Sequence, residues 1–154
     1  MAEYRSQSAA LLLFNREGQL YCVQELQSKP EIGKIVGCKD YSFPWETQEA
    51  EERQLRTVHR LIVEEVDATD QVRFFLPIPN WIGCVPVYDT LAHVYVAQYV
   101  KGPENMRGVH ADIEIRPLGW LTRQELLARC RDGVREVLAL FDKYQTDLRT
   151  CSCG

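Results

Sequence analysis

Short apolar runs separated by turn residues dominate the first and central parts of the chain. Residues 8–15 are mostly apolar, residues 20–25 alternate between apolar and polar, and residues 15–18 (NREG) carry turn residues. This arrangement is typical of a β-hairpin. Residues 72–79 and 91–100 also predict strands, and the prolines between them confine the intervening segment to sheet edges or loops.

A different periodicity begins near Glu49 and predicts a helix that ends near Asp67. Four apolar side chains recur there every three or four residues, as on one face of a helix: Leu55, Val58, Ile62 and Val66. Charged residues repeat every four positions in the same segment: Glu52, Arg56, Arg60 and Glu64. We therefore expect an amphipathic helix that packs against the strands.

The last part of the chain predicts one more strand and two helices. Residues 113–121 alternate between apolar and other side chains, and Thr122 with Glu125 forms a capping-box pair that begins a helix. Gly133 separates this helix from a final one over residues 134–144. Strands and helices mixed in this order predict an α/β fold.

Glycines and prolines predict loops at residues 27–47 and 101–110, and neither loop has the composition of a linker between domains. No internal repeat or low-complexity tract is present. We expect a single domain over residues 1–148, followed by a flexible C-terminal tail, 149–154, that ends in CSCG.

The composition narrows the classes of function. The chain has 154 residues, 45% hydrophobic and 26% charged, which is ordinary for a globular protein. A formal net charge of −4 gives no electrostatic reason to expect a nucleic acid or an anionic membrane as partner. No apolar run approaches the roughly 20 residues that span a bilayer. Without a recognisable targeting segment, a cytoplasmic location is expected, where scattered cysteines remain free thiols.

Two adjacent acids near the end of the predicted helix are the strongest candidates for chemistry. At 100° per residue, Glu65 borders the apolar face, where a desolvated carboxylate needs a cationic partner, and Glu64 lies on the side of Arg60. Carboxylates are the ligands that Mg²⁺ prefers, and this ion also binds phosphates. The position one turn before Glu65, where a second ligand is expected, holds Leu61.

This segment resembles the box of the Nudix hydrolases, whose signature is Gly-x5-Glu-x7-Arg-Glu-apolar-x-Glu-Glu-x-Gly-apolar. Five positions match at the family's spacing: Glu52, Arg60, Ile62, Glu64 and Glu65. The other positions depart from it: Glu46 and Asp67 replace the glycines, Leu61 replaces a glutamate, and Ala68 matches the last apolar position weakly. The Phe-Pro before the box, the N-terminal hairpin and the GWLTRQEL segment are also similar to the family, so the resemblance covers nearly the whole chain.

The resemblance implies a Nudix-like α/β/α sandwich with a mixed β-sheet. It also implies a metal-dependent hydrolase that uses Mg²⁺ or Mn²⁺ to cleave a nucleoside diphosphate linked to another moiety. By position, Glu64 and Glu65 are the expected metal ligands, and Glu52 with Arg60 is the ion pair that orients the box. The glutamate missing at Leu61 implies weaker metal binding and reduced activity.

Individual roles follow from the resemblance and from the positions of charged and aromatic residues. The expected catalytic acids are Glu64, Glu65 and Glu114, and the expected metal ligands are Glu64, Glu65, Asp112 and Glu114. The candidates to replace the missing ligand are Glu46, Asp112 and Glu114. The candidates to contact substrate are Arg60, Trp81 and Arg107. The three histidines show no mutual ligand spacing, and His93, within an apolar strand, is expected to have a structural role in the sheet.

Two alternatives to the hydrolase stay open. The first is a catalytically silent module of the same fold that binds or senses a nucleotide. The second is an enzyme similar to isopentenyl diphosphate isomerase, with Cys38 as its cysteine, although the accompanying histidine ligands are not recognisable. Strands such as 91–100 leave room for a homodimer.

Overall fold

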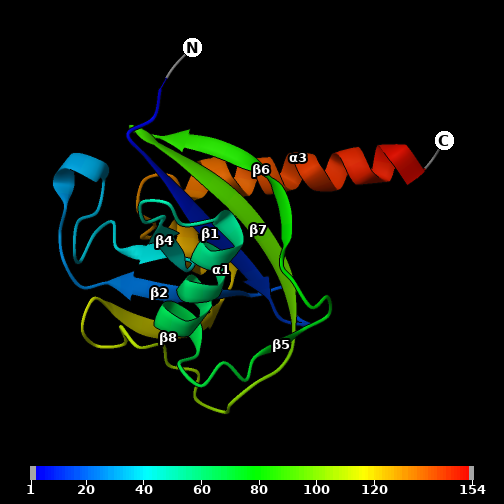
Figure 1. Cartoon of the computed structure of the whole chain (residues 1–154), viewed down its shortest axis with the longest axis horizontal. Coiled ribbons are helices and arrows are strands. Elements are labelled where there is room, and N and C mark those ends of the chain that lie inside the picture. The colour runs from blue at the N-terminus through cyan, green and yellow to red at the C-terminus, as the bar shows by residue number, and fades with distance from the viewer. Residues whose placement is uncertain (1–2, 153–154) are drawn as a thin grey trace.

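The computed structural model describes residues 3–152 of the chain, and the side chains of residues 3–149. These residues form a mixed β-sheet covered by helices on both faces (Figure 1). No helix among them is long and apolar enough to cross a membrane.

The sheet is built around two long strands, β1 (Ser6–Phe14) and β7 (Thr90–Lys101), which pair in parallel from Ser6 opposite Thr90 to Phe14 opposite Gln98. The other pairs are antiparallel. Their strands are β2 (Leu20–Glu25), β3 (Tyr41–Ser42), β4 (Trp45–Thr47), β5 (Arg73–Phe74), β6 (Asn80–Val87) and β8 (Ile115–Leu121).

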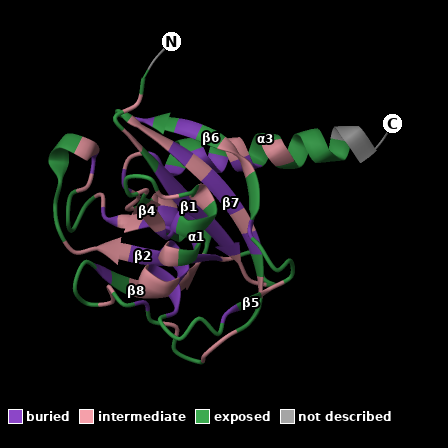
Figure 2. Cartoon of the chain, in the orientation of Figure 1, coloured by how far each residue is buried: buried purple, intermediate pink, exposed green. Residues whose placement is uncertain are grey.

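The apolar run of β1 is continuous because both faces of the sheet are buried, as Figure 2 shows. Ala10 and Leu12 face one cluster, which includes side chains of α3 (Val134–Ser152). Leu11 and Leu13 face the other cluster, which includes side chains of α1 (Gln54–Leu61). The sheet thus separates two helical layers, and the predicted α/β/α sandwich is confirmed.

Three predictions about strands need comment. The hairpin of β1 and β2 is present, with Phe14 opposite Leu20. The strand predicted over 72–79 is wrong in extent, since β5 covers only two residues and Pro77 lies in the following bend. The segment expected at an edge or in a loop is the strand β6, which pairs with β7.

The amphipathic helix differs from its prediction at its start and on its apolar face. It begins at Gln54, later than Glu49, and continues from Leu61 into the π-helical turn η2 (Ile62–Val66). Leu55 is 57% exposed, whereas Leu61 is fully buried. The apolar face of the helix therefore excludes Leu55, the first of the four predicted residues. It includes Leu61, at the position where the family signature has a glutamate.

The C-terminal helices follow the predicted signals. Both hydrogen bonds of the Thr122–Glu125 capping box are present at the start of α2 (Arg123–Leu127). Gly133 has φ +98°, a left-handed conformation that favours glycine, and it precedes α3. This helix extends to Ser152, beyond the predicted end at residue 144. The short helical turn η1 (Pro30–Ile32) lies in the first long loop. The domain boundary at 148 stays a prediction, and the side chains of Cys151 and Cys153 lie outside the described residues.

Candidate functional site

A π-helical turn presents the two adjacent acids of the box. In η2 the amide of Asp67 donates to the carbonyl of Ile62 at 2.8 Å, five residues back, instead of the usual four. The loop after β7 binds the carbonyls this turn leaves free. Val109 N donates to Val63 O at 3.1 Å, and His110 N donates to Glu64 O at 2.9 Å. The loop and the turn therefore hold each other in place.

Gly108 permits this contact, because a side chain there has no space. A Cβ atom on Gly108 would lie 2.0 Å from the carbonyl oxygen of Glu64 and 2.5 Å from the amide nitrogen of Glu65. Both are backbone atoms that cannot move without disrupting the turn. The glycine thus fixes how closely the loop that carries His110 approaches the box.

Asp67, which replaces the second glycine of the box, organises the chain after the turn. Its backbone is extended, with φ −152°, so no left-handed conformation is required there. Its side chain accepts hydrogen bonds from the amides of Thr69, Gln71 and Val72 at 2.7–3.1 Å. Burial opposes ionisation of Asp67, but these hydrogen bonds outweigh it and lower its pKa. The replacement is compatible with an ordered box.

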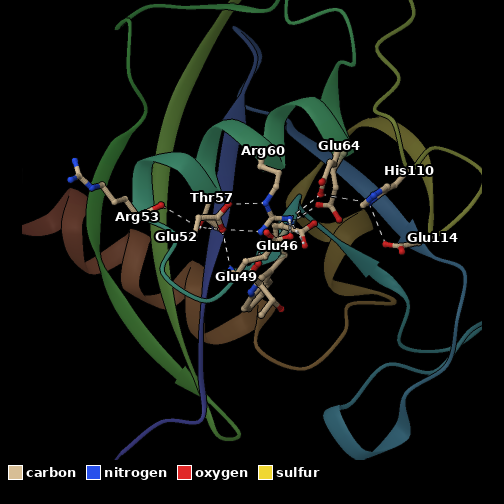
Figure 3. A network of polar contacts seen from close by, with 12 residues as sticks. Glu46, Glu49, Glu52, Arg53, Thr57, Arg60, Glu64, His110 and Glu114 are labelled. Atoms are coloured by element: carbon tan, nitrogen blue, oxygen red, sulfur yellow. Dashed lines mark hydrogen bonds and ion pairs between the residues drawn. The ribbon is translucent and has the colours of Figure 1, made fainter.

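Arg60 is the centre of the polar network in Figure 3. Its guanidinium binds both carboxylate oxygens of Glu52 at 3.0 Å, and Nη2 donates to the carbonyl of Thr47 at 2.6 Å. Nη1 lies 3.1 Å from Glu46 and 3.2 Å from Glu64. The hydrogen bonds from Arg60 lower the pKa of Glu52 to about 2. The expected Glu52–Arg60 ion pair is present, and Arg60 is largely satisfied by protein groups.

Three side chains converge beside Arg60 in a way suited to a metal ion. Ligand atoms of Glu46, Glu64 and His110 all lie within 4.8 Å of one another. Burial, together with the neighbouring Glu64, raises the pKa of Glu46 to about 7. Among the described residues, His110 Nδ1 is the one buried side-chain nitrogen or oxygen atom with no hydrogen-bond partner, although it lies 3.2 Å from Glu114 Oε2. Two carboxylates and an unpartnered imidazole nitrogen fit a divalent cation.

Glu65 is more deeply placed than its neighbour. It is only 6% exposed, and its Oε2 accepts the amide hydrogen of Trp45 at 2.6 Å. Burial, with Glu25 nearby, raises the pKa of Glu65 well above its usual range. The prediction that this acid lies where the helix meets the sheet in a desolvated position is confirmed.

Glu65 opens onto a small polar cavity of about 160 Å³. Acids and lysines line it together: Glu25, Glu46, Glu65, Glu114, Lys29 and Lys34. Lys34 Nζ lies 3.4 Å from Glu25 Oε1, and both side chains are mostly buried. The cavity therefore combines acidic groups that could hold a cation with cationic groups that could hold a phosphate.

Leu61 lies one turn before Glu65, but its side chain packs into the core. It is fully buried in the apolar cluster that includes Val58, Tyr21 and Ile115, and it does not line the cavity. The position that holds a glutamate in the family signature here contributes to the core.

The structure brings some of the predicted site residues together and separates others. Glu64 and Glu65 belong to the site, and Glu114 lines the cavity beside His110. Asp112 instead pairs with Arg107, and each of these two side chains is more than half exposed. Among the described residues, neither of them lines the Glu65 cavity.

Two further candidates lie elsewhere. Trp81 is on β6, where its indole nitrogen donates to His93 Nδ1 at 3.3 Å, and it does not line the cavity. Cys38 is exposed and lines a different cavity, with Arg129 and Asp132. Neither residue has a place in the cluster around Glu64.

His110 is the residue that sequence reasoning missed. It has no partner at ligand spacing in the sequence, and only the fold of the loop after β7 brings it to Glu64. Lys34 and Glu25 also gave no signal, because their roles depend on a cavity formed between separate segments. Glu46 was the one member of this cavity lining outside the helix that the sequence indicated early in the chain, because it stands at the first position of the box.

Comparisons with solved structures identify the fold. A NUDIX hydrolase from Nitrosomonas europaea is 16% identical, with a TM-score of 0.63 over 90% of this chain and 88% of that chain. The MutT protein from Methanosarcina mazei Go1 is 13% identical, with a TM-score of 0.60 over 96% and 97% of the two chains. A C. elegans Ap4A hydrolase is 13% identical, with a TM-score of 0.55 over 93% and 98%.

In sequence, no protein-family model matches the chain, and no curated protein is significantly similar to it. The similarity therefore lies in the arrangement of helices and strands. The chain has a Nudix-like fold, as the resemblance of its box and flanking segments implied.

Proposed function

We propose that this protein is a divalent-metal-dependent hydrolase of a nucleoside diphosphate linked to another moiety. The observation that supports the proposal is the convergence of Glu46, Glu64 and His110 next to buried Glu65 at a polar cavity. Glu64 and Glu65 belong to the η2 turn, at the positions where the family signature has its adjacent acids, which supports the proposal. A cytoplasmic location and a homodimer stay predictions.

The residues that would hold the cation are Glu46, Glu64 and His110, with Glu114 close to the imidazole. Carboxylate oxygens suit both Mg²⁺ and Mn²⁺, and the imidazole nitrogen favours Mn²⁺, because Mg²⁺ prefers oxygen ligands. When bound, such an ion supplies charge neutralisation at the phosphate oxygens and lowers the pKa of a bound water. Glu46 takes over the ligand position that Leu61 leaves empty.

The protein's own groups provide positioning and proton transfer. Arg60 holds Glu46 and Glu64 on one side of the cluster through its ion pairs, while Glu52 fixes the guanidinium. Glu65 is held by the Trp45 amide and borders the cavity, so it is our candidate general base. Its carboxylate takes a proton from water as the water oxygen bonds to phosphorus. The bond from phosphorus to the bridging oxygen then breaks, and the leaving phosphate keeps the electron pair.

A comparison of Glu65→Gln with the unchanged chain tests this proposal. Glutamine can still accept the Trp45 amide but cannot take up the proton, so hydrolysis should fall by roughly 10²–10⁴-fold. The assay measures phosphate-containing products from a panel of nucleoside diphosphate derivatives with Mg²⁺ or Mn²⁺. Glu17→Gln, an exposed acid in the β1–β2 turn, is the matched control and should leave the rate unchanged.

Two outcomes would contradict the proposal. The first is turnover of the panel by the unchanged chain that does not exceed that of Glu65→Gln. The second is a rate that is independent of the added cation. Circular dichroism of both variants separates a catalytic loss from a loss of folding.

A silent nucleotide-binding module is the second candidate, and the burial of Leu61 favours it. One anionic ligand of the family's signature is absent, and Arg60 already neutralises part of the remaining acidic cluster. This candidate predicts that a nucleotide raises the midpoint of thermal unfolding without turnover, because the ligand binds only the native state. No shift across the nucleotide panel would count against it.

A further inference from the structure

A second polar cavity adjoins the one at Glu65 and extends the candidate site. It has a volume of about 130 Å³ and shares four lining residues with the first cavity: Lys29, Lys34, Trp45 and Thr47. The acids Glu46, Glu65 and Glu114 line only the first cavity, whereas Arg131 lines only the second. The combined trough therefore runs from an acidic end to a cationic end.

The two lysines in the middle of the trough are held next to each other by the backbone. Lys29 N donates to Lys34 O at 2.8 Å, and Lys34 N donates to Lys29 O at 3.1 Å, across the turn that contains η1. Gly33 closes this turn in the left-handed conformation, with φ +75°. Backbone pairing thus brings two cationic side chains to the lining of both cavities, where an anionic ligand would reduce their mutual repulsion.

Arg131 adds a third cation from the other side of the trough. It is 7% exposed, and its guanidinium lies 4.5 Å from the centre of the Trp45 ring. Nε donates to the carbonyl of Asp132 at 3.3 Å, and Nη1 lies 3.6 Å from Glu25. Among the described residues, Glu25 is the one acid in ion-pair range of both Arg131 and Lys34. Glu25 lines the first cavity and not the second, whose charged lining residues are Lys29, Lys34 and Arg131.

The remaining lining of the cationic end is hydroxyl-rich. Ser8, Tyr88 and Thr90 line it, and the hydroxyls of Tyr88 and Thr90 are hydrogen-bonded to Asp132 and Ser6. Ser8 Oγ accepts the indole hydrogen of Trp45 at 2.8 Å, so the ring that supports Arg131 is itself fixed. Cationic side chains on a rigid frame suit a phosphate group.

We infer that Lys29, Lys34 and Arg131 bind a phosphate that lies beyond the diphosphate to be cleaved. This inference rests on the proposed function, because it takes the acidic end as the place of cleavage. The preferred substrates would then carry at least one additional phosphate. That phosphate belongs either to a longer phosphoanhydride chain or to a phosphorylated group at the far end of the substrate.

A binding experiment without metal tests the cationic end by itself. Titration calorimetry of the full chain with inorganic tripolyphosphate should give measurable affinity, which the Lys29→Gln/Lys34→Gln double variant should reduce by about tenfold or more. Lys101→Gln/Lys143→Gln removes the same charge from β7 and α3 and should change the affinity less than about twofold, because neither lysine lines the two cavities and distant surface charges are screened. Equal losses in the two double variants, or no binding by the unchanged chain, would overturn the inference.

A kinetic experiment distinguishes the two sources of the extra phosphate. The ratio of kcat/KM is compared for two pairs: a nucleoside triphosphate against the matching diphosphate, and a nucleoside diphosphate sugar with and without a phosphate on the sugar. In the preferred pair, Lys29→Gln/Lys34→Gln should lower kcat/KM for the member with the additional phosphate. It should leave kcat/KM for the other member nearly unchanged. A uniform loss in both members of both pairs would contradict the inference. If tripolyphosphate binds through these lysines but no substrate is hydrolysed, the anion site holds and the proposed hydrolysis fails.

Discussion

The box helix has a polar side, with Arg60 and Glu64, and an apolar side, with Val58 and Leu61, and the two sides have different roles. The side with Arg60 and Glu64 holds charges close together in a network that is only partly exposed. The side with Val58 and Leu61 is buried against the sheet without polar contacts. Adjacent residues such as Arg60 and Leu61 thus serve different ends, the first in the polar network and the second in the core.

This difference explains how the chain departs from the family's box. A leucine at the missing ligand position adds apolar burial, and Glu46 from β4 supplies a carboxylate from the opposite direction. Because β4 precedes the helix and pairs with β1, the position of this carboxylate depends on the sheet.

The largest expected effect on stability comes from the apolar side. Leu61→Ala removes a fully buried side chain and should lower the free energy of unfolding by about 2–5 kcal/mol, because a cavity remains. Its effect on Mn²⁺ affinity should be small. Urea unfolding and titration calorimetry measure the two quantities. A loss of Mn²⁺ affinity equal to that of a Glu64 variant would remove the distinction between the two sides.

The polar side should contribute stability that depends on pH. Glu52→Gln breaks the two-oxygen contact with Arg60 and should cost about 2 kcal/mol at pH 7. The pKa of Glu52 falls from 4.5 to about 2 on folding, so its ionised form stabilises the protein above pH 4.5. That contribution is lost as the pH falls through about 2. Unfolding measured from pH 7 downwards should show the difference between variant and parent shrinking below pH 4.5, and a constant difference would contradict this account.

The histidine should affect metal binding more than stability. His110→Ala removes a proposed ligand and should weaken Mn²⁺ binding by at least about tenfold. His59→Ala is the matched control, because His59 is more than half exposed beside Asp70 and lies outside the cluster. Titration calorimetry with both variants checks this. Equal affinities in the two variants would exclude His110 from the metal site.

The smallest effect is expected at an exposed ion pair far from the box. Arg123 and Asp142 lie 2.8 Å apart, with side chains 41% and 53% exposed. Arg123→Ala should change the free energy of unfolding by less than about 1 kcal/mol, because water screens such pairs. Urea unfolding of this variant and of Glu52→Gln compares how much an exposed and a mostly buried ion pair contribute to the free energy of unfolding. A larger loss from Arg123→Ala than from Glu52→Gln would contradict the comparison.

Several features of the fold could be predicted because they depend on local sequence. The β1–β2 hairpin and the Thr122–Glu125 capping box are formed by neighbouring residues, and both are present. The box helix was also predictable from its period, but its apolar face was not fully so. Leu55 matches the period and is exposed, because it lines an open cavity with Val58 and Ile62 and is not packed into the core.

The sequence by itself determined the mixed α/β class, the position of the box and the adjacent acids Glu64 and Glu65. These features depend on hydrophobic period and spacing, which are properties of short segments. Only the tertiary structure decided that His110 and Glu46 meet Glu64, and that Asp112 pairs with Arg107 instead. Such contacts join residues far apart in the chain, and they depend on backbone hydrogen bonds and steric fit, as at Gly108, that no local pattern encodes.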